Sequence, residues 1–428
     1  MGVRKGYKLT DGREIPEDWD IVTLSDKCVK ITKGTTPTTL GFAYVDYGIP
    51  FIKAESVSES GHILKEKVAY IDPKVHAILE RSQLKTGDML FSIAGVIGRV
   101  GTVTDSDVPA NINQALALIR LQSDGNADPD YYYYCLSSQL IKEQIIDITV
   151  QAAQQNLSLG YVKNLKLPMP RGKKEQADIA VALGNADSLI DSLEALIEKK
   201  RLIKRGAMEE LLTGTRRLPG FSGDWRSVYF GAIGRCLRGV SYNPDCDLLE
   251  GDSSDSVKLL RASNVQLEQV VFGEVQYVRS RRVRDEQLLR ENDVLLCMAN
   301  GSKNLVGKAA RFAKLASDGY TFGAFMGCFR TNPDVANPLL VSHYFATSQF
   351  RHHIDLLLAG SSINNLSPRS IESFSTLLPV DPLEQSAIAQ VLSDMDAEIE
   401  ALEAKLEKAR AIKRGMMEEL LTGKIRLV

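Results

Sequence analysis

Residues 175–218 read EQADIAVALGNADSLIDSLEALIEKKRLIKRGAMEELLTGTRRL, and residues 384–427 read EQSAIAQVLSDMDAEIEALEAKLEKARAIKRGMMEELLTGKIRL. Aligned without gaps, roughly 26 of about 44 positions are identical, far beyond chance for a segment of this length. The two copies lie about 209 residues apart, which is near half the chain. The sequence therefore predicts a tandem duplication, each half being a variable part followed by a nearly identical segment.

Both copies have the pattern of a long helix. Apolar residues fall at Ile179, Leu183, Ala186, Ile190, Leu193 and Ile197, and at Ile388, Leu392, Met395, Ile399, Leu402 and Leu406. This alternation of four and three residues is typical of a coiled-coil seam. We expect Asp381 as N-cap, Pro382 as first helical residue and Glu384 in a capping box. Gly214 and Gly423 suit left-handed C-caps. Each helix would have ~38 residues and a length of ~57 Å.

Such a helix cannot bury its seam alone, and two arrangements are open. Each helix could pack on its own half, or the two copies could pair as an antiparallel coiled coil with pseudo-two-fold symmetry. Duplication favours pairing, because identical surfaces are self-complementary. The charged stretches at 197–205 and 406–414 are either solvated faces or a docking surface for another subunit.

The variable parts share a weaker skeleton in the same order. Asp-Trp opens each part at Trp19 and Trp225, and three further pairs follow: residues 49–57 and 257–265, 87–101 and 292–307, and 155–170 and 364–380. Short β-branched segments between Gly, Asn and Asp turns indicate strands, while residues 129–145 and 338–358 indicate helices. The predicted class is α+β. The predicted domains are residues 1–170 and 215–380, with spacer helices in 171–214 and 381–428.

Composition limits the class of protein. The formal net charge is −2, which does not suit a protein that coats DNA through a basic surface. None of the six cysteines forms a CxxC pair, so zinc ribbons are disfavoured. No apolar run approaches the ~18 residues of a membrane span, and the first residues lack a signal core. We expect a cytoplasmic protein.

Signatures of catalysis are also missing. The Asn-Pro pairs lack the aromatic residue of an amino-methyltransferase motif, and no glycine-rich turn suits S-adenosylmethionine. Residues 301–308 resemble a phosphate loop with one residue too many, followed by Ala309 instead of Ser or Thr. The five histidines have no metal-ligand spacing. The chemistry is therefore expected from partners.

The combined order of motifs resembles the specificity subunits of type I restriction-modification systems. It comprises a tryptophan near the start, Gly-Thr-Thr-Pro at 34–37, FIKAESV, GDMLFSIAG, INQALALIR at 112–120, QQNLS at 154–158, and Pro-x-x-x-x-Glu-Gln opening the helix. The resemblance covers the whole chain, in duplicate. The second half departs from the first at 239–244 (GVSYNP for GTTPTT) and at 299–304 (ANGSKN for IAGVIG).

The resemblance implies a non-catalytic subunit with two target recognition domains, each reading one half of a split site in double-stranded DNA. It further implies that the helices bind two methyltransferase subunits and that motor-nuclease subunits complete the complex. S-adenosylmethionine, ATP and Mg would bind only those partners, and no cofactor or metal is expected on this chain.

We take candidate contacts to DNA from the polar loops between the strands. Arg and Lys can bind phosphates and guanine, and Asn and Gln can bind adenine. The candidates are Lys30, Lys33, Thr35, Thr36, Lys53, Arg99 and Gln114 in the first part, and Arg238, Arg261, Asn264, Arg281, Arg282, Arg284, Asn300, Lys303 and Lys308 in the second. Candidate coiled-coil and partner contacts are Ile190, Leu193, Ile197, Ile399, Leu402 and Leu406.

Two other classes stay open from the sequence. A fused methyltransferase would need a cofactor-binding domain, for which the duplicated parts leave no room. A coiled-coil adaptor that binds only protein would not bind DNA selectively. The different basic loops of the two halves argue against this adaptor.

Overall fold

The computed structural model describes residues 3–123, 127–152, 156–266, 268–314, 319–360 and 364–427. The chain forms two compact units: unit 1 comprises residues 1–194 and 405–428, and unit 2 comprises residues 195–404. Each unit has a globular α/β part, which we call head 1 (residues 3–170) or head 2 (residues 219–380). Each unit also holds a segment of both long helices, α5 (Lys173–Leu212) and α11 (Pro382–Leu420).

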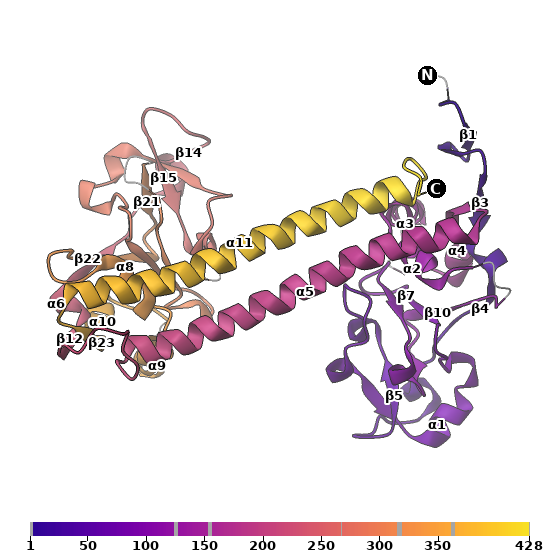
Figure 1. Cartoon of the computed structure of the whole chain (residues 1–428), viewed down its shortest axis with the longest axis horizontal. Coiled ribbons are helices and arrows are strands. Elements are labelled where there is room, and N and C mark those ends of the chain that lie inside the picture. The colour runs from indigo at the N-terminus through magenta and orange to yellow at the C-terminus, as the bar shows by residue number, and fades with distance from the viewer. Residues whose placement is uncertain are drawn as a thin grey trace. The chain divides into compact units, whose positions relative to one another are not determined.

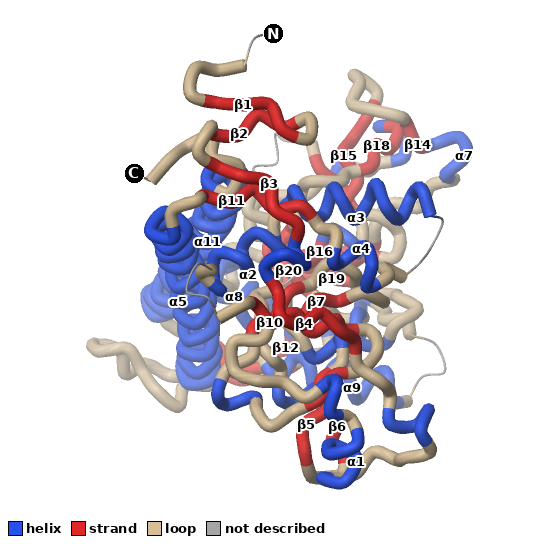
Figure 2. The backbone as a smooth tube through the Cα atoms, turned by 90° about the vertical axis from the view of Figure 1, so that its right-hand side faces the viewer, coloured by secondary structure: helices blue, strands red, loops and turns tan. Residues whose placement is uncertain are grey.

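Head 1 consists of small sheets. The hairpin β1–β2 lies beside an antiparallel pair, β3 and β11 (Figure 2). A four-stranded sheet has the order β4-β10-β7-β8, and a three-stranded sheet has the order β6-β5-β9 with β5 parallel to β9. The bounds are β1 Tyr7–Thr10, β2 Arg13–Pro16, β3 Trp19–Thr23, β4 Cys28–Lys33, β5 Ile49–Ile52, β6 Ala69–Ile71, β7 Met89–Ser92, β8 Val100–Thr102, β9 Asn111–Ile112, β10 Leu116–Leu121, β11 Lys166–Pro170, α1 Pro73–Ile78, α2 Pro129–Ser137, α3 Gln139–Ala152 and α4 Leu159–Lys163.

Head 2 repeats this plan with extra strands. The pair β12–β23 corresponds to β3–β11, and the six-stranded sheet β13-β22-β19-β20-β17-β16 contains the counterpart of the four-stranded sheet. The third sheet, β14-β18-β15-β21, again has one parallel pair, β15 with β21. The bounds are β12 Trp225–Tyr229, β13 Gly234–Arg238, β14 Leu248–Leu249, β15 Ser256–Leu260, β16 Val265–Gln266, β17 Gln269–Val270, β18 Gln276–Arg279, β19 Val294–Cys297, β20 Ala309–Arg311, β21 Tyr320–Phe322, β22 Met326–Thr331, β23 Ser375–Pro379, α6 Phe230–Ile233, α7 Pro244–Asp247, α8 Pro338–Tyr344, α9 Ser348–Ala359 and α10 Pro368–Glu372.

The core of each unit is completed by both long helices. In unit 1 the start of α5, through Ile179 and Leu183, and the end of α11, through Leu420, are buried together with head 1. In unit 2 the end of α5, through Leu211 and Leu212, and the start of α11 are buried with head 2 in the same way. Each head therefore packs on the helix that follows it and on the last turns of the other helix.

The helices confirm the periodicity argument. They have 40 and 39 residues, α11 begins at Pro382, and Asp381 accepts a hydrogen bond from the Leu383 N–H over 2.9 Å. Gly214 and Gly423 adopt the left-handed conformation expected after a helix end, with φ of 72° and 69°. Every predicted seam residue is buried or half-buried: Ile179, Leu183, Ala186, Ile190, Leu193, Ile197, Ile388, Leu392, Met395, Ile399, Leu402 and Leu406.

Inside each unit, the segments of α5 and α11 lie side by side and antiparallel (Figure 1). In unit 2, Arg201 binds Glu403 over 2.6 Å, whereas Lys204, one turn further along α5, binds Asp396 earlier in α11 over 2.5 Å. The ion pairs of unit 1 occupy the corresponding repeat positions: Arg410 with Glu194, and Lys413 with Asp187. Both arrangements considered for the seam thus occur, pairing in the middle and packing on heads at the ends.

One local expectation was wrong. Glu384 does not form a capping box, because its buried carboxylate accepts two hydrogen bonds from Arg217 instead. The segments 129–145 and 338–358 are helical as expected, and each consists of two helices. Ser138 breaks the first with an extended backbone and a hydroxyl bonded to the Cys135 carbonyl, and Thr347 caps a new helix in the second. In the described part of the chain, no helix is both long and apolar enough to cross a membrane.

Candidate nucleic-acid interface

Polar loops of head 1 meet at a close backbone crossing, and we call this group loop cluster 1 (residues 34–48, 53, 93–98 and 113–115). A Cβ added to Gly34 would lie 1.8 Å from the carbonyl oxygen of Ile112, so only glycine fits where the loop crosses this strand. The Thr36 hydroxyl then bonds to the Gln114 side chain, and Arg81 donates to the Thr35 hydroxyl over 3.0 Å. The crossing therefore places hydroxyl, amide and guanidinium groups side by side.

The end of β5 and the turn after β7 belong to the same cluster. The Asn113 N–H donates to the carbonyl of Ile52, immediately before Lys53, over 3.1 Å. The Ile93 N–H donates to the Ala115 carbonyl over 2.8 Å, and the Leu157 N–H donates to Ile93 over 2.8 Å. Motifs that are far apart in the sequence thus converge. Gln154 and Gln155 of QQNLS lie outside the described residues.

Head 2 has the same crossing, loop cluster 2 (residues 239–247, 261, 298–308, 323–325 and 364–366). A Cβ at Gly239 would lie 1.9 Å from the Gly323 carbonyl oxygen. The Gly323 N–H donates to Leu260 over 3.0 Å, and the Met298 N–H donates to the Phe325 carbonyl over 2.9 Å. Sequence analysis named both glycines only as the first residues of the motifs at 34–37 and 239–244 and missed their role in the backbone crossing, although each directly follows a strand.

Some of the candidate DNA contacts of head 1 lie in loop cluster 1, and others do not. Thr35, Thr36, Gln114 and Lys53 belong to loop cluster 1, and Lys33 ends β4 directly before Gly34. Lys30 instead lies on β4 opposite Arg120, where burial and the charge of Arg120 lower its pKa. Arg99 turns inward, donating to the Val57 carbonyl over 2.8 Å and pairing with Glu59 over 3.8 Å.

The candidate DNA contacts of head 2 likewise lie partly in loop cluster 2 and partly elsewhere. Arg238 is exposed at the end of β13 directly before Gly239, while Asn300, Lys303 and Lys308 lie on the turn after β19. Arg261 is the counterpart of Lys53, since both precede a short 3-10 turn. Asn264 is buried, and its side chain already bonds to the N–H of Arg261 and to the carbonyls of Val271 and Glu274.

The basic stretch 278–284 is tied to an acidic partner. Arg282 donates to the buried carboxylate of Asp247 over 2.8 Å, and Arg281 lies 3.7 Å from it. The hydrogen bond from Arg282 lowers the pKa of Asp247 to about 2. Arg284 pairs with Glu286 over 3.1 Å. This arrangement anchors the loop after Gly239 and leaves part of the basic charge exposed, because the Arg281 side chain is 68% exposed.

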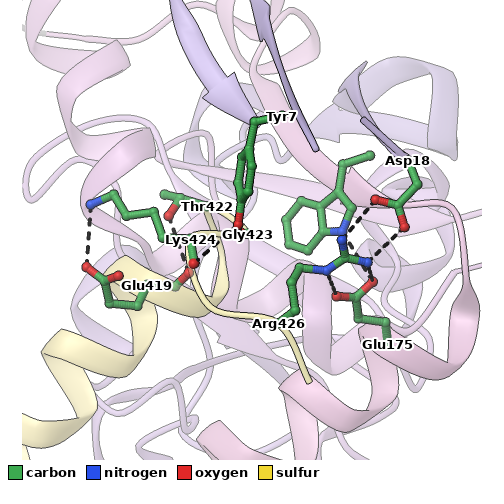
Figure 3. A network of polar contacts seen from close by, with 9 residues as sticks. Tyr7, Asp18, Glu175, Glu419, Thr422, Gly423, Lys424 and Arg426 are labelled. Carbon is green, nitrogen blue, oxygen red and sulfur yellow. Dashed lines mark hydrogen bonds and ion pairs between the residues drawn. The ribbon is translucent and has the colours of Figure 1, made fainter. Parts of the chain in front are cut away.

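Charged residues fasten the helix ends of unit 1 to head 1 (Figure 3). In unit 1, Arg426 behind α11 donates to Glu175 at the start of α5 over 2.5 and 2.8 Å and to Asp18 of head 1 over 2.9 and 2.8 Å. Trp19 donates its indole N–H to Glu175 over 3.2 Å, and Tyr7 donates to the Gly423 carbonyl over 2.9 Å. We call this the unit 1 clamp.

Unit 2 has a simpler clamp at the matching positions. Arg217, just behind α5, donates to both oxygens of Glu384 over 2.5 and 2.7 Å and to the Gly223 carbonyl over 3.0 Å. Among the described residues, the buried indole nitrogen of Trp225 has no hydrogen-bond partner. The clamps fix how each head meets the helices inside its own unit.

A second contact joins each head to the middle of the helices. Tyr134 donates to Asp187 over 2.8 Å, and Asp187 also binds Lys413. In head 2, His343 occupies the corresponding helix position, 3.8 Å from Asp396, which binds Lys204. His343 is buried, and burial lowers its pKa to about 4, so the ring is neutral at pH 7.

Across the residues that the structure describes, His, Cys, Asp and Glu side chains form no group of three or more that could hold a metal ion. Two unlike polar loop clusters stand on matching scaffolds, each fastened to a pair of long helices. These features define a class of protein: two globular heads with matching scaffolds and unlike polar loops, each fixed to a pair of long antiparallel helices.

Comparison with known proteins agrees with this class. A sequence model of the type I restriction modification DNA specificity domain matches residues 16–200. The MjaX type I restriction enzyme specificity subunit of Methanocaldococcus jannaschii is 25% identical over 99% of this chain and 97% of its own length. The EcoKI specificity subunit of Escherichia coli is 28% identical over 47% of this chain and 42% of its own length.

Solved structures agree in fold. The S subunit of a type I restriction-modification system from M. genitalium superposes with a TM-score of 0.58 over 97% of this chain and 98% of its own, at 14% identity. This chain is similar in sequence and in fold to the specificity subunits of type I restriction-modification systems.

Proposed function

We propose that the two loop clusters read the two halves of a split DNA site, one half per head. The observation that carries this proposal is the contrast between matched scaffolds and unlike loops. Gly34 and Gly239 make the same crossing, yet the side chains presented around them differ. Heads that read different bases need different hydrogen-bonding groups, because each base pair presents its own pattern in the major groove.

We further propose residues 1–170 and 215–380 as recognition domains, with spacer helices in 171–214 and 381–428. Within the domains, Lys33, Thr35, Thr36, Lys53 and Gln114 face the first half-site, and Arg238, Arg261, Asn300, Lys303 and Lys308 face the second. Arg281, Arg282 and Arg284 add phosphate contacts, which give register and salt-dependent affinity. Lys30, Arg99 and Asn264 support the loops through their contacts within the protein.

The experiment is methylation mapping in cells that express the chain with its methyltransferase subunit. The proposal requires a split motif with a fixed gap. Exchanging residues 224–380 for those of a relative should change only one half of the motif, and exchanging residues 20–170 should change only the other. A change in both halves, or in neither, would contradict the assignment.

Two methyltransferase subunits are proposed to dock on α5 and α11 through the charged stretches 197–205 and 406–414. Ile203 and Ile412 are equivalent positions of the repeat, and both are about half exposed among charged neighbours, at 48% and 52%. An exposed apolar residue ringed by charges is typical of an interface core with a polar rim. Motor-nuclease subunits and a cytoplasmic location stay predictions from the sequence.

This docking is tested by the mass of the purified complex. Ile203→Asp or Ile412→Asp alone should reduce two bound methyltransferase subunits to one, and the double variant should bind none. Val181→Asp, at another exposed apolar position of α5, is the matched control and should retain both subunits. Full binding by the double variant would place the docking surface elsewhere.

A further inference from the structure

Phe325 is an exposed aromatic residue inside loop cluster 2. The residue is 72% exposed and lies in the turn between β21 and β22. Single exposed apolar residues are common on protein surfaces and by themselves indicate nothing. The position of Phe325 among the groups proposed to read DNA distinguishes it from other exposed residues such as Leu356 on α9.

Three backbone hydrogen bonds fix the conformation of this turn. The Phe325 carbonyl accepts hydrogen bonds from the N–H groups of Met298 and Ala299, over 2.9 and 3.2 Å. The Met326 N–H closes the turn on the Gly323 carbonyl over 2.8 Å. A side chain on a backbone fixed in this way is presented in one place, which favours binding because little backbone freedom is lost.

Groups that can hydrogen-bond to bases flank the turn. Asn300 follows Ala299 directly, and the exposed Arg238 lies on β13 opposite Gly327, two residues beyond Phe325. The corresponding turn of head 1 carries Gln114, which bonds to Thr36, and Ala115. The same turn therefore presents an amide in head 1 and a large apolar surface in head 2.

We infer that Phe325 contacts the 5-methyl group of a thymine in the half-site read by head 2. This inference rests on the proposed function of loop cluster 2. The thymine methyl is the one apolar group that the bases expose in the major groove, and Phe is a known type of partner for it. Arg238 and Asn300 on either side would bind neighbouring base edges and position the duplex.

The test uses the purified chain in complex with its methyltransferase subunits and duplexes carrying the mapped site. Each thymine of the second half-site is replaced in turn by uracil, which lacks the methyl group. At one position the wild type should bind about fourfold more weakly, the value of one buried methyl group. Phe325→Ala should lose at least that affinity on thymine DNA and should lose nothing more with uracil at that position.

Leu356→Ala is the matched control, since it removes an exposed apolar side chain of head 2 outside the cluster, and it should retain the response to uracil. The inference would be overturned if, at every position, Phe325→Ala lowered the affinity by the same factor relative to the wild type on thymine DNA and on uracil DNA. The side chain would then act by insertion or packing and not through the methyl group. A second half-site without a required thymine would also overturn it. If the wild-type complex recognised no split site, the proposed function itself would fail.

Discussion

The two units are alike where the helices pair and unlike where the loops cluster. Arg201–Glu403 and Lys204–Asp396 in unit 2 recur at the same repeat positions as Arg410–Glu194 and Lys413–Asp187 in unit 1. Around Gly34 and Gly239 the backbone crossing is retained, whereas the surrounding side chains are replaced. The scaffold therefore retains a fixed set of charges, while the loop clusters retain only a fixed backbone crossing.

The two clamps differ in how many donors serve the buried glutamate. Glu175 accepts hydrogen bonds from Arg426 and also from Trp19, and Arg426 is shared with Asp18. Among the described residues, Glu384 accepts side-chain hydrogen bonds from Arg217 alone, and its side chain is fully buried. Unit 2 therefore depends more strongly on one arginine.

The largest effect is expected from removing that arginine. Arg217→Ala leaves a buried carboxylate without its cation, which should lower the free energy of unfolding of unit 2 by about 3–5 kcal/mol. Arg426→Ala should cost unit 1 only about 2 kcal/mol, because Glu175 keeps the hydrogen bond from Trp19. Urea unfolding followed by tryptophan fluorescence measures both, since each unit contains one tryptophan.

A double variant provides the control for the clamp. Glu384→Gln combined with Arg217→Ala should recover much of the loss, because an amide costs less to bury than an unpaired charge. Equal losses for Arg217→Ala and Arg426→Ala would remove the distinction between the two clamps.

The backbone crossing offers the next test. In Gly34→Ala the new methyl group would collide with the Ile112 carbonyl, so the turn at 113–115 must shift, at a cost of about 1–3 kcal/mol. Methylation should then lose fidelity in the first half-site only, and Gly239→Ala should affect only the second. Gly172→Ala is the control, because its Cβ would meet open space. Loss of fidelity in both halves from either variant would contradict independent heads.

A pH dependence should separate the two contacts between heads and helices. Burial holds the pKa of His343 near 4, despite the opposing charge of Asp396, and Lys204 and Arg311 lower it further. The unfolded chain binds this proton near pH ~6.5, so the stability from a neutral His343 is present above that pH and is lost as pH falls towards 4. Unit 2 should lose about 2 kcal/mol between about pH 7.5 and about pH 5 from this residue.

His343→Tyr supplies the matched comparison, since it gives unit 2 the residue that unit 1 has at Tyr134. Its unfolding free energy should fall by about 2 kcal/mol less than that of the wild type over the same pH range. Parallel pH profiles for the two proteins would show that His343 is not the responsible group.

The smallest effect concerns a single phosphate contact. Lys303→Ala should weaken DNA binding only a few-fold and lower the slope of log affinity against log salt by about 0.9. Lys74→Ala, on α1 of head 1 outside the loop cluster, should leave that slope unchanged. An unchanged slope for Lys303→Ala would exclude this lysine from the phosphate contacts.

The helices could be predicted from the sequence because their period and caps are local signals. Asp381 and Pro382 mark the start of α11, and Gly423 marks its end, without knowledge of any distant residue. The clamps could not be predicted, because Arg217 and Glu384 are brought together by the tertiary structure. Glu384 sits where a capping box would place it, yet the distant arginine binds it more strongly than a cap would.

The candidate site was predictable only by region. Lys30 and Lys33 look equivalent in the sequence, but three residues along a strand reverse the face of the sheet. One therefore lies beside Arg120 and the other at the loop cluster. Phe325 gave no signal at all, because a phenylalanine between two strands reads as core until the turn is seen to point it outward.

Each copy of the repeat supplies the cation to one unit and the anion to the other, as Arg201 with Glu194 and Arg410 with Glu403 illustrate. A recombination event that overwrote one copy with the other would therefore leave these ion pairs intact. Recombination within the repeated helical segments would therefore retain the scaffold. It could combine different heads in one chain without new mutations in the helices.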